Sequence, residues 1–380
     1  MLILNKILNY TKQLSFLCPL LIGLVLLFVA LIPGLKTTSD SFLYRQGAEY
    51  LFENGFEGIF QQKVFLAKPV LFSLFLIPFV NKLYLLKIVH MVIYCTSFYL
   101  VNLLLRLYIE DHLYRWIYNL LFVLSTVIIM DHVFVWTEPL FLMLLLLYLL
   151  KLYQNFESIS KWKLVALTVT GLSLCLLKHV GIFFVIFPAA MTWIYCMQKK
   201  EKPAILWLSS IQLVVPVFYF LIWHFLVWEY GGNPNRIDHF SGVDFIGNYQ
   251  LISKAITSWF FIPVISKYVG CIFLPVMLTF LFLTIRLSTK RSIRWFLLAS
   301  LVTVGIYLII LFTKGDMIFS DDDRYVSLIY PIIMLLLVGG VEKMTNLRPK
   351  IKPHLLILSG VFIVYNLVRV VKNVWFWSEL

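Results

Sequence analysis

Runs of apolar residues long enough to cross a membrane dominate this sequence. A helix needs about 20 consecutive, mostly apolar residues to span the hydrocarbon core of a bilayer, and such runs recur along the whole chain of 380 residues. Hydrophobic residues make up 61% of the chain and charged residues 13%, a balance that excludes an ordinary water-soluble globular protein. The expected fold class is therefore an all-α, polytopic membrane protein.

About eleven membrane-spanning helices are predicted from these runs. Residues Pro69 to Val80 are apolar but short, and are expected to re-enter the membrane or to lie at its surface. The first run follows Lys6 and Lys12, is too long for a signal-peptide core and lacks a small-residue cleavage site, so it is expected to remain as an uncleaved span. The predicted spans are 16–33, 84–105, 117–131, 133–150, 164–178, 180–197, 204–227, 268–285, 295–313, 325–342 and 354–371.

The distribution of basic residues between the loops predicts the orientation. With a cytoplasmic N-terminus, 18 of the 32 Lys and Arg residues and 5 of the 19 acids lie on the cytoplasmic side, which leaves 14 of each on the other side. The whole net charge of +13 then lies on one face, as the positive-inside rule requires. The positive charge therefore indicates topology in a cell membrane, and nucleic acid is not expected as a partner.

A single transmembrane domain covering 1–380 is expected, without a soluble C-terminal domain. Its two long extracytoplasmic loops are 34–68 and 229–267. The first contains the stretch "SDSFLYRQGAEYLFENG", which predicts an amphipathic helix lying flat on the membrane surface. One face of that helix is apolar and the other is charged, with members Tyr44, Ala48 and Leu51, and Arg45, Glu49 and Glu53 respectively.

Asp40 opens this stretch, where the first span meets the outer interface. A carboxylate at that depth is expected to be solvated, paired or functional. A structural explanation is equally open, because an Asp at the start of a helix commonly caps its free N–H groups.

Two further charged residues lie at points where the chain enters the membrane. Lys68 precedes Pro69; its ammonium could snorkel toward the headgroups or bind a phosphate. Glu138 precedes Pro139 at the head of an apolar span, where an ionisable residue indicates function unless it serves only as a helix cap.

Other charged residues are expected at the same membrane face. "LLKHVGIFF" places Lys178 and His179 at a turn, and Asp131 and His132 are expected at another. Arg324 and Tyr325 stand at the head of a span, where a guanidinium can clamp a phosphate or carboxylate. The neighbouring Asp321 and Asp322 are interpreted as a solvated loop in preference to a metal site.

The order of these motifs resembles the integral-membrane sugar transferases of the GT-C class. The similar motifs are "SD" after the first span, "KP" at re-entry, "TEPLF", "LLKHVG" and "DRYVSLIYPIIMLLL", spread between about Ser39 and Leu337. The likeness is greatest to bacterial aminoarabinose transferases and protein O-mannosyltransferases, which use polyprenyl-phosphate sugars. The chain departs from them in having Val70 where the aminoarabinose motif has a second proline, and no second acid beside Asp40.

This resemblance implies an inverting glycosyltransferase with its active site on the extracytoplasmic face, a polyprenyl-phosphate-linked sugar as donor and an acceptor of unknown kind. Asp40 would be the general base and Glu138 a second catalytic acid residue. Membrane lipid surrounds the site, and a divalent metal is left open, with Asp40, Glu138 and Asp131 as its candidate ligands. The substrate-binding residues would be Lys68, Lys178, Arg324, Tyr44 and Tyr325.

Two other classes of protein stay open. A lipid or polysaccharide transporter would line a path with the same charged groups, but it predicts ionisable residues through the depth of the membrane, and the middles of most spans carry none. A membrane acyltransferase or polysaccharide polymerase would also act on lipid-linked substrates. The adjacent acid and histidine considered for it are Asp131 and His132, which a turn explains as well.

Overall fold

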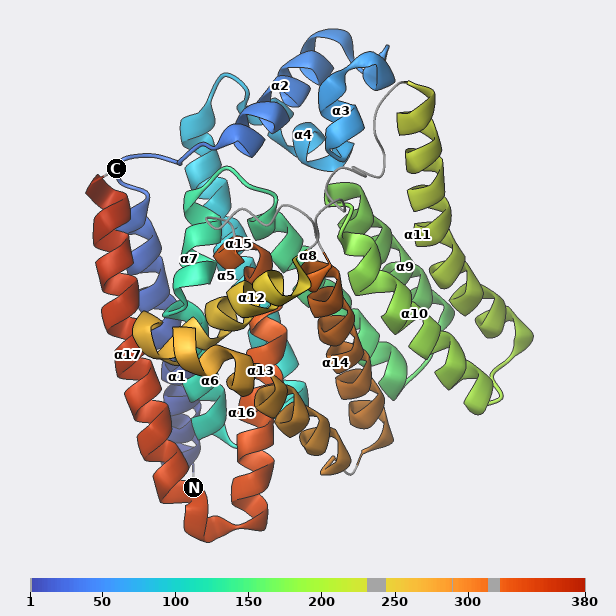
Figure 1. The fold of residues 1–380 in the computed structure, drawn as a ribbon. Coiled ribbons are helices and arrows are strands. Elements are labelled where there is room, and N and C mark those ends of the chain that lie inside the picture. Colours follow the sequence, from blue (N-terminus) through green and yellow to red (C-terminus); the bar gives the residue numbers. More distant parts are fainter. Residues whose placement is uncertain (1, 231–243, 289, 314–321, 380) are drawn as a thin grey trace.

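The computed structural model describes residues 2–230, 244–288, 290–313 and 322–379, and this part of the chain is helical nearly throughout (Figure 1). In the described ranges the only pairing of extended backbone is an isolated bridge between Lys36 and Phe134. The all-α prediction is therefore confirmed.

Among the described residues, seven helices are long and apolar enough to cross a membrane, or up to eight if one bent pair counts as a span. The bent pair is α6 (His112–Val123) and α7 (Thr126–Val133), which meet at 44° around the Ser125 cap. The prediction of a multi-pass membrane protein is confirmed, whereas the count of eleven is not. The seven are α5 (Leu83–Tyr108), α8 (Glu138–Glu157), α10 (Gly181–Gln198), α11 (Pro203–Glu229), α13 (Pro263–Arg286), α14 (Arg291–Phe312) and α17 (Lys352–Glu379).

The helices that fall outside this set explain the difference in count. The described apolar part of α1 (Leu2–Ala30) is Phe16–Ala30, and α9 (Lys161–Leu177) has 17 residues. The predicted span 325–342 is divided into α15 (Asp322–Ser327) and α16 (Tyr330–Leu347), because Pro331 stands in the first turn of a new helix.

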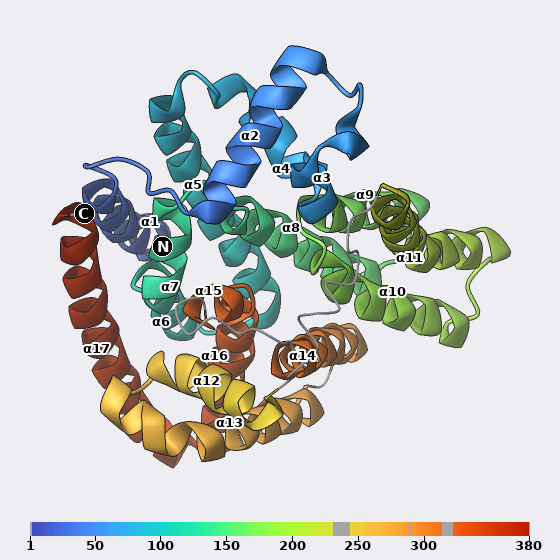
Figure 2. The same ribbon diagram turned by 45° about the horizontal axis from the view of Figure 1, so that its top comes forward.

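Helices differ in how much of their surface other helices cover. In α8 67% of the apolar window is buried, whereas the corresponding values for α11 and α17 are 17% and 11%. Helix α8 packs against α5, α9 and α14, while α11 and α17 lie at opposite edges of the bundle (Figures 1 and 2). The apolar outer faces of α11 and α17 are therefore available to lipid.

A small layer of short helices covers one end of the bundle (Figures 1 and 2). It contains α2 (Ser39–Asn54), α3 (Lys63–Ala67) and α4 (Val70–Leu76), which continues into a 3₁₀ turn at Ile77–Phe79. The predicted apolar face of α2 is buried at Tyr44, Ala48 and Leu51. Its polar face carries an exposed pair in which Arg45 Nε lies 2.8 Å from Glu49 Oε1, as the i, i+4 spacing predicts.

The structure adds a helix to one predicted loop and contradicts one predicted turn. The segment 229–267 contains helix α12 (Phe245–Ser258), which Asp244 caps by accepting a hydrogen bond from the Gly247 N–H at 2.8 Å, and whose apolar face packs against α13. Asp131 and His132 do not lie at an outer turn, because both are buried within α7. Residues 231–243 of the predicted loop, and Asp321, lie outside the described residues.

Candidate active site

One guanidinium joins the two acids that the sequence singles out. Arg324 Nη1 lies 2.9 Å from Asp40 Oδ2, and Arg324 Nε lies 2.6 Å from Glu138 Oε1. The three residues belong to α15, α2 and α8. Helices far apart in the sequence therefore converge on one charged cluster, in which Arg324 is the central residue.

Two lysines complete the cluster. Lys68 Nζ lies 2.7 Å from Asp40 Oδ1, and Lys178 Nζ lies 2.7 Å from Glu138 Oε1. Lys68 follows α3 directly, and Lys178 follows α9. With three cations and two carboxylates the five residues, called the charged cluster below, carry one positive charge in excess at neutral pH.

The side chains of the charged cluster differ in their access to the surface. The exposed fraction is 25% for Asp40, 16% for Lys68 and 17% for Lys178, but 7% for Arg324 and zero for Glu138. Asp40 and the two lysines can therefore contact a ligand directly. Glu138 lies beneath them, where it can act only through the cations it binds.

Asp40 does not cap its helix, so the structural explanation for this residue is wrong. The N-cap of α2 is Thr38, whose hydroxyl accepts from the Ser41 N–H at 3.5 Å, while Ser41 Oγ accepts from the Thr38 N–H at 3.0 Å. Because this reciprocal capping box satisfies the helix start, the Asp40 carboxylate is free to bind Lys68 and Arg324.

Backbone and side-chain hydrogen bonds connect the start of α2 and the segment before it to the segment before α8. The Lys36 N–H donates to Val133 O and the Val135 N–H donates to Lys36 O, both at 2.9 Å. Ser41 Oγ donates to Val135 O at 2.9 Å. These contacts fix Asp40 and Glu138 on neighbouring elements, so the distance between the two acids depends on them.

Trp136 contacts the charged cluster, although the sequence did not single it out. Its ring lies 4.4 Å from Arg324 Cζ, and its Nε1–H donates to Thr38 Oγ1 at 2.9 Å. A tryptophan face stabilises a guanidinium through its quadrupole. The available signal was its position two residues before Glu138 in "VWTEP".

The turn between α9 and α10 positions Lys178, as "LLKHVG" predicts. The α9 helix ends at Leu177, and α10 begins at Gly181. A Cβ atom on Gly181 would lie 2.3 Å from the backbone oxygen of Leu174, so no side chain fits there. The glycine permits the close approach that places Lys178 beside Glu138.

Charge pairing sets the protonation states outside the membrane helices. Burial acts to raise the pKa of the Asp40 carboxyl, but Lys68 and Arg324 outweigh it and hold that pKa below the usual value. For Arg324, burial opposes the charge, and Glu138 and Asp40 outweigh burial, so its pKa lies above the usual value. Both groups are therefore charged at neutral pH.

The two predicted binding tyrosines have different surroundings. Tyr44 is buried against Phe72, with ring centroids 4.9 Å apart, and the Lys68 ammonium lies 5.6 Å from its ring. Burial, Glu138 and Asp40 raise the Tyr44 pKa, so its hydroxyl stays protonated. Tyr325 is half-buried, and its backbone carbonyl accepts from Tyr307 Oη at 2.9 Å. Tyr44 therefore supports the charged cluster from behind.

Asp131 lies behind the charged cluster, close enough to Glu138 and Lys178 to interact with them electrostatically. Neither of its buried carboxyl oxygens has a hydrogen-bond partner among the described residues. The Ser327 hydroxyl, which faces the same carboxyl group, donates instead to Arg324 O at 2.7 Å. Asp131 thus lies near the cluster without an ion pair of its own in the described ranges.

The three acids proposed as metal ligands do not fit a divalent metal. Asp40 binds Lys68 and Arg324, and Glu138 binds Lys178 and Arg324, so their oxygens face cations. Within the ranges that the structure describes, no three His, Cys, Asp or Glu side chains are grouped to hold a metal.

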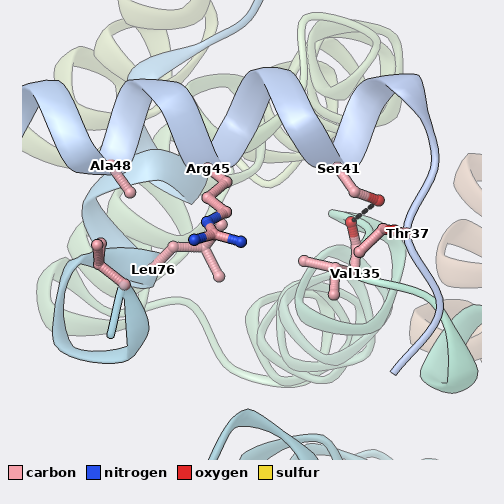
Figure 3. Close-up of a pocket in the computed structure, with 7 residues that line it drawn as sticks. Thr37, Ser41, Arg45, Ala48, Leu76 and Val135 are labelled. Carbon is pink, nitrogen blue, oxygen red and sulfur yellow. Dashed lines mark hydrogen bonds between the residues drawn. The ribbon is translucent and has the colours of Figure 1, made fainter. Parts of the chain in front are cut away.

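A small hollow lies between α2, α4 and the segment before α8, and no residue of the charged cluster lines it (Figure 3). Its volume is about 20 Å³, enough for one water molecule and too small for a sugar. Figure 3 shows Arg45, Ser41 and Val135 around it. The hollow is therefore not a site for a ligand larger than water, whereas Asp40, Lys68 and Lys178 of the charged cluster are partly exposed.

Comparison with known proteins adds no relative. No protein-family model matches this chain, and no curated protein is significantly similar to it.

Proposed function

We propose that this protein is an inverting glycosyltransferase that moves a sugar from a polyprenyl-phosphate donor to a hydroxyl acceptor at the extracytoplasmic face of a cell membrane. The observation that carries the proposal is the pairing of one partly exposed carboxylate, Asp40, with Lys68 and Arg324 at one end of a bundle of apolar helices. A base and two cations at the membrane surface are the groups that this reaction needs.

The cations serve the donor side of the reaction. When the bond between the sugar C1 and the phosphate oxygen breaks, the electron pair stays on that oxygen, and fixed positive charges stabilise it. Lys68 and Lys178 are partly exposed, and the charged cluster has one positive charge that its own carboxylates do not neutralise. A phosphate can therefore bind there without displacing an existing ion pair.

Asp40 serves the acceptor side. Each of its oxygens accepts from one cation and keeps a further lone pair, and the side chain is 25% exposed. As the acceptor oxygen forms its bond to C1, its proton passes to Asp40. Attack from the face opposite the departing phosphate inverts the anomeric centre through an oxocarbenium-like transition state.

Glu138 positions the cations and does not contact the substrate. It is fully buried, and it binds Arg324 at 2.6 Å and Lys178 at 2.7 Å. Two cations fixed before the reaction starts stabilise a developing charge without reorganisation. Glu138 therefore acts as a positioning residue, in place of the catalytic role that the sequence suggested.

The α2 layer fits a lipid-linked donor. The outer surface of α2 and the following turn exposes Phe42, Phe52 and Phe56, whose exposed fractions are between 60% and 64%. Exposed aromatic rings beside charged residues suit the level of the lipid headgroups. This layer would hold the charged cluster at the depth where a polyprenyl chain leaves the bilayer and its phosphate enters water.

The test is sugar transfer by purified protein in lipid nanodiscs, with a panel of synthetic polyprenyl-phosphate sugars and release of polyprenyl phosphate as readout. Asp40→Asn should reduce the rate by roughly 10²- to 10⁴-fold, the usual contribution of a general base. Glu49→Gln, on the exposed face of the same helix, is the matched control and should keep the rate. Transfer by Asp40→Asn at the wild-type rate would show that Asp40 is not the base.

A transporter of lipids or polysaccharides is the second candidate. It would need polar groups through the depth of the bundle, and buried Asn102 and Asn119 do pair deep inside at 2.9 Å. However, most of the buried His, acidic and basic side chains in the described ranges gather toward the end that carries the charged cluster: His90, Asp131, His132, Glu138 and Arg324. The other one, Glu342, lies at the opposite end, where it accepts from the Glu110 and Asp111 N–H groups. Movement of a fluorescent polyprenyl-phosphate lipid across vesicles, without any sugar transfer, would favour the transporter.

A further inference from the structure

An open groove lies beside the first turns of α14. These turns lie at the end of the bundle opposite the α2 layer, where α10 and α13 end (Figure 1). Its volume is about 480 Å³. The groove is lined by Ile285 of α13 and by Arg291, Arg294, Trp295 and Leu298 of α14.

The lining residues of α14 form a single stripe. Their spacing of i, i+3, i+4 and i+7 places them on one face of the helix, over about 10 Å of its length. From the helix start inward, the stripe passes from two exposed guanidiniums to a half-buried indole and then to an aliphatic side chain. A phospholipid presents the same sequence of chemistry, from phosphate through the glycerol region to the acyl chain.

Neighbouring side chains hold the groove in shape. Arg291 Nη2 donates to Gln198 Oε1 at 2.9 Å, and its Cζ lies 5.7 Å from the Tyr195 ring centre. The Trp295 ring packs 5.6 Å from the same tyrosine. Arg291 and Trp295 are therefore positioned before any ligand binds.

No ion pair or helix-dipole interaction accounts for the charges of the two arginines. Positive charges in the first turns of a helix oppose its dipole, so Arg291 and Arg294 do not stabilise α14. Among the residues that the structure describes, neither has a carboxylate within ion-pair distance. The helix start also lacks a side-chain cap, which leaves its N–H groups suited to an anion.

We propose that this groove binds an anionic phospholipid of the membrane leaflet opposite the charged cluster. The lipid phosphate lies between Arg291 and Arg294, Trp295 lies at the level of the glycerol, and one acyl chain follows Leu298 and Ile285. Basic pockets between membrane helices are the usual sites for such headgroups. The proposal is independent of the glycosyltransferase assignment, because it concerns other residues at the other end of the bundle.

The experiment is native mass spectrometry of the protein released from nanodiscs that contain phosphatidylglycerol and phosphatidylcholine. The wild type should retain phosphatidylglycerol in preference, and millimolar inorganic phosphate should not displace it. In the double variant Arg291→Gln, Arg294→Gln, lipid affinity should fall roughly 10- to 30-fold. This is the effect expected when two basic residues each lose their electrostatic attraction to an anionic lipid. The double variant Arg291→Lys, Arg294→Lys keeps the charge and should retain the lipid.

A second double variant separates the groove from the general positive charge of this end. The double variant Lys161→Gln, Arg348→Gln removes two exposed charges that lie outside the groove on the same side of the bundle, one at the start of α9 and one just after α16. It should retain phosphatidylglycerol. Equal loss in both double variants, equal retention of phosphatidylcholine by the wild type, or release of the lipid by inorganic phosphate would each overturn the proposal.

Discussion

Replacing Glu138 by Gln tests the central contact of the charged cluster. The substitution keeps the shape of a fully buried side chain and removes the charge that faces Arg324 Nε at 2.6 Å and Lys178 Nζ at 2.7 Å. Removing one partner of a buried ion pair typically costs about 3–5 kcal/mol, because the other charge is left buried and uncompensated.

The structure places the expected loss at the lower end of that range. Arg324 keeps Asp40 at 2.9 Å, and Lys178 is 17% exposed and can reach water. We therefore expect Glu138→Gln to lower the free energy of unfolding by about 3 kcal/mol. The assay is unfolding of the purified protein in detergent micelles, followed by helical circular dichroism and by thermal inactivation of sugar transfer.

The control is Glu49→Gln, which breaks an exposed pair with Arg45 whose side chains are 39% and 50% exposed. Such a pair contributes about 0–1 kcal/mol, and solvent screening places this one at the lower end. A double-mutant cycle with Arg324→Gln should show strong coupling to Glu138, because both residues belong to one network. If Glu138→Gln proves as stable as Glu49→Gln, Glu138 does not hold the cations and the arrangement described here is wrong.

Three further predictions follow from the same contacts. The folded-state pKa of Asp40 is depressed below 3.8, so its ion pairs stabilise the protein fully above that pH and this stabilisation is lost as the pH falls through the lower folded pKa. In acid unfolding experiments, wild type and Asp40→Asn should therefore differ in stability above pH 3.8, and the difference should disappear below the folded pKa. Trp136→Phe removes the hydrogen bond to Thr38 and weakens the cation–π contact with Arg324, so it should lower the free energy of unfolding by about 1–2 kcal/mol in the same assay. A wild-type stability would show that the indole contributes nothing. Gly181→Ala forces the Leu174 carbonyl away and shifts Lys178, so it should destabilise the fold by about 1–3 kcal/mol and slow sugar transfer. Unchanged transfer kinetics would show that this turn has no part in positioning Lys178.

Much of the fold could be predicted because membrane helices are encoded locally. A helix in the bilayer must satisfy all its backbone hydrogen bonds within itself, so a run of apolar residues specifies a helix without reference to the rest of the chain. This holds for α5, α10 and α11, whose bounds lie within a few residues of the predicted spans, whereas α17 continues to Glu379, well past the predicted end at 371. The amphipathic pattern of α2 is equally local, and its buried face matches the prediction.

Predictions failed where a helix depends on its neighbours. The apolar stretch of the predicted span 325–342 runs from the end of α15 into α16, and composition does not show the break between the two helices. Helix α12 is short and mixed in polarity, and it packs against α13. The sequence offers no local signal for that contact, so the segment resembled a loop.

By itself the sequence determined that the protein lies in a membrane, where most of its helices begin and end, and that Asp40, Lys68, Glu138, Lys178 and Arg324 all stand at helix ends. Periodicity assigns a residue to a face of its own helix, but it carries no information about which helix lies opposite. Only the tertiary structure decided that Arg324 lies between Asp40 and Glu138, that Glu138 is buried beneath the other charges, and that Trp136 supports the guanidinium. The Arg324–Glu138 contact joins residues 186 positions apart, and the Arg324–Asp40 contact joins residues still farther apart. Both exist because the packing of α2, α8 and α15 brings their ends together.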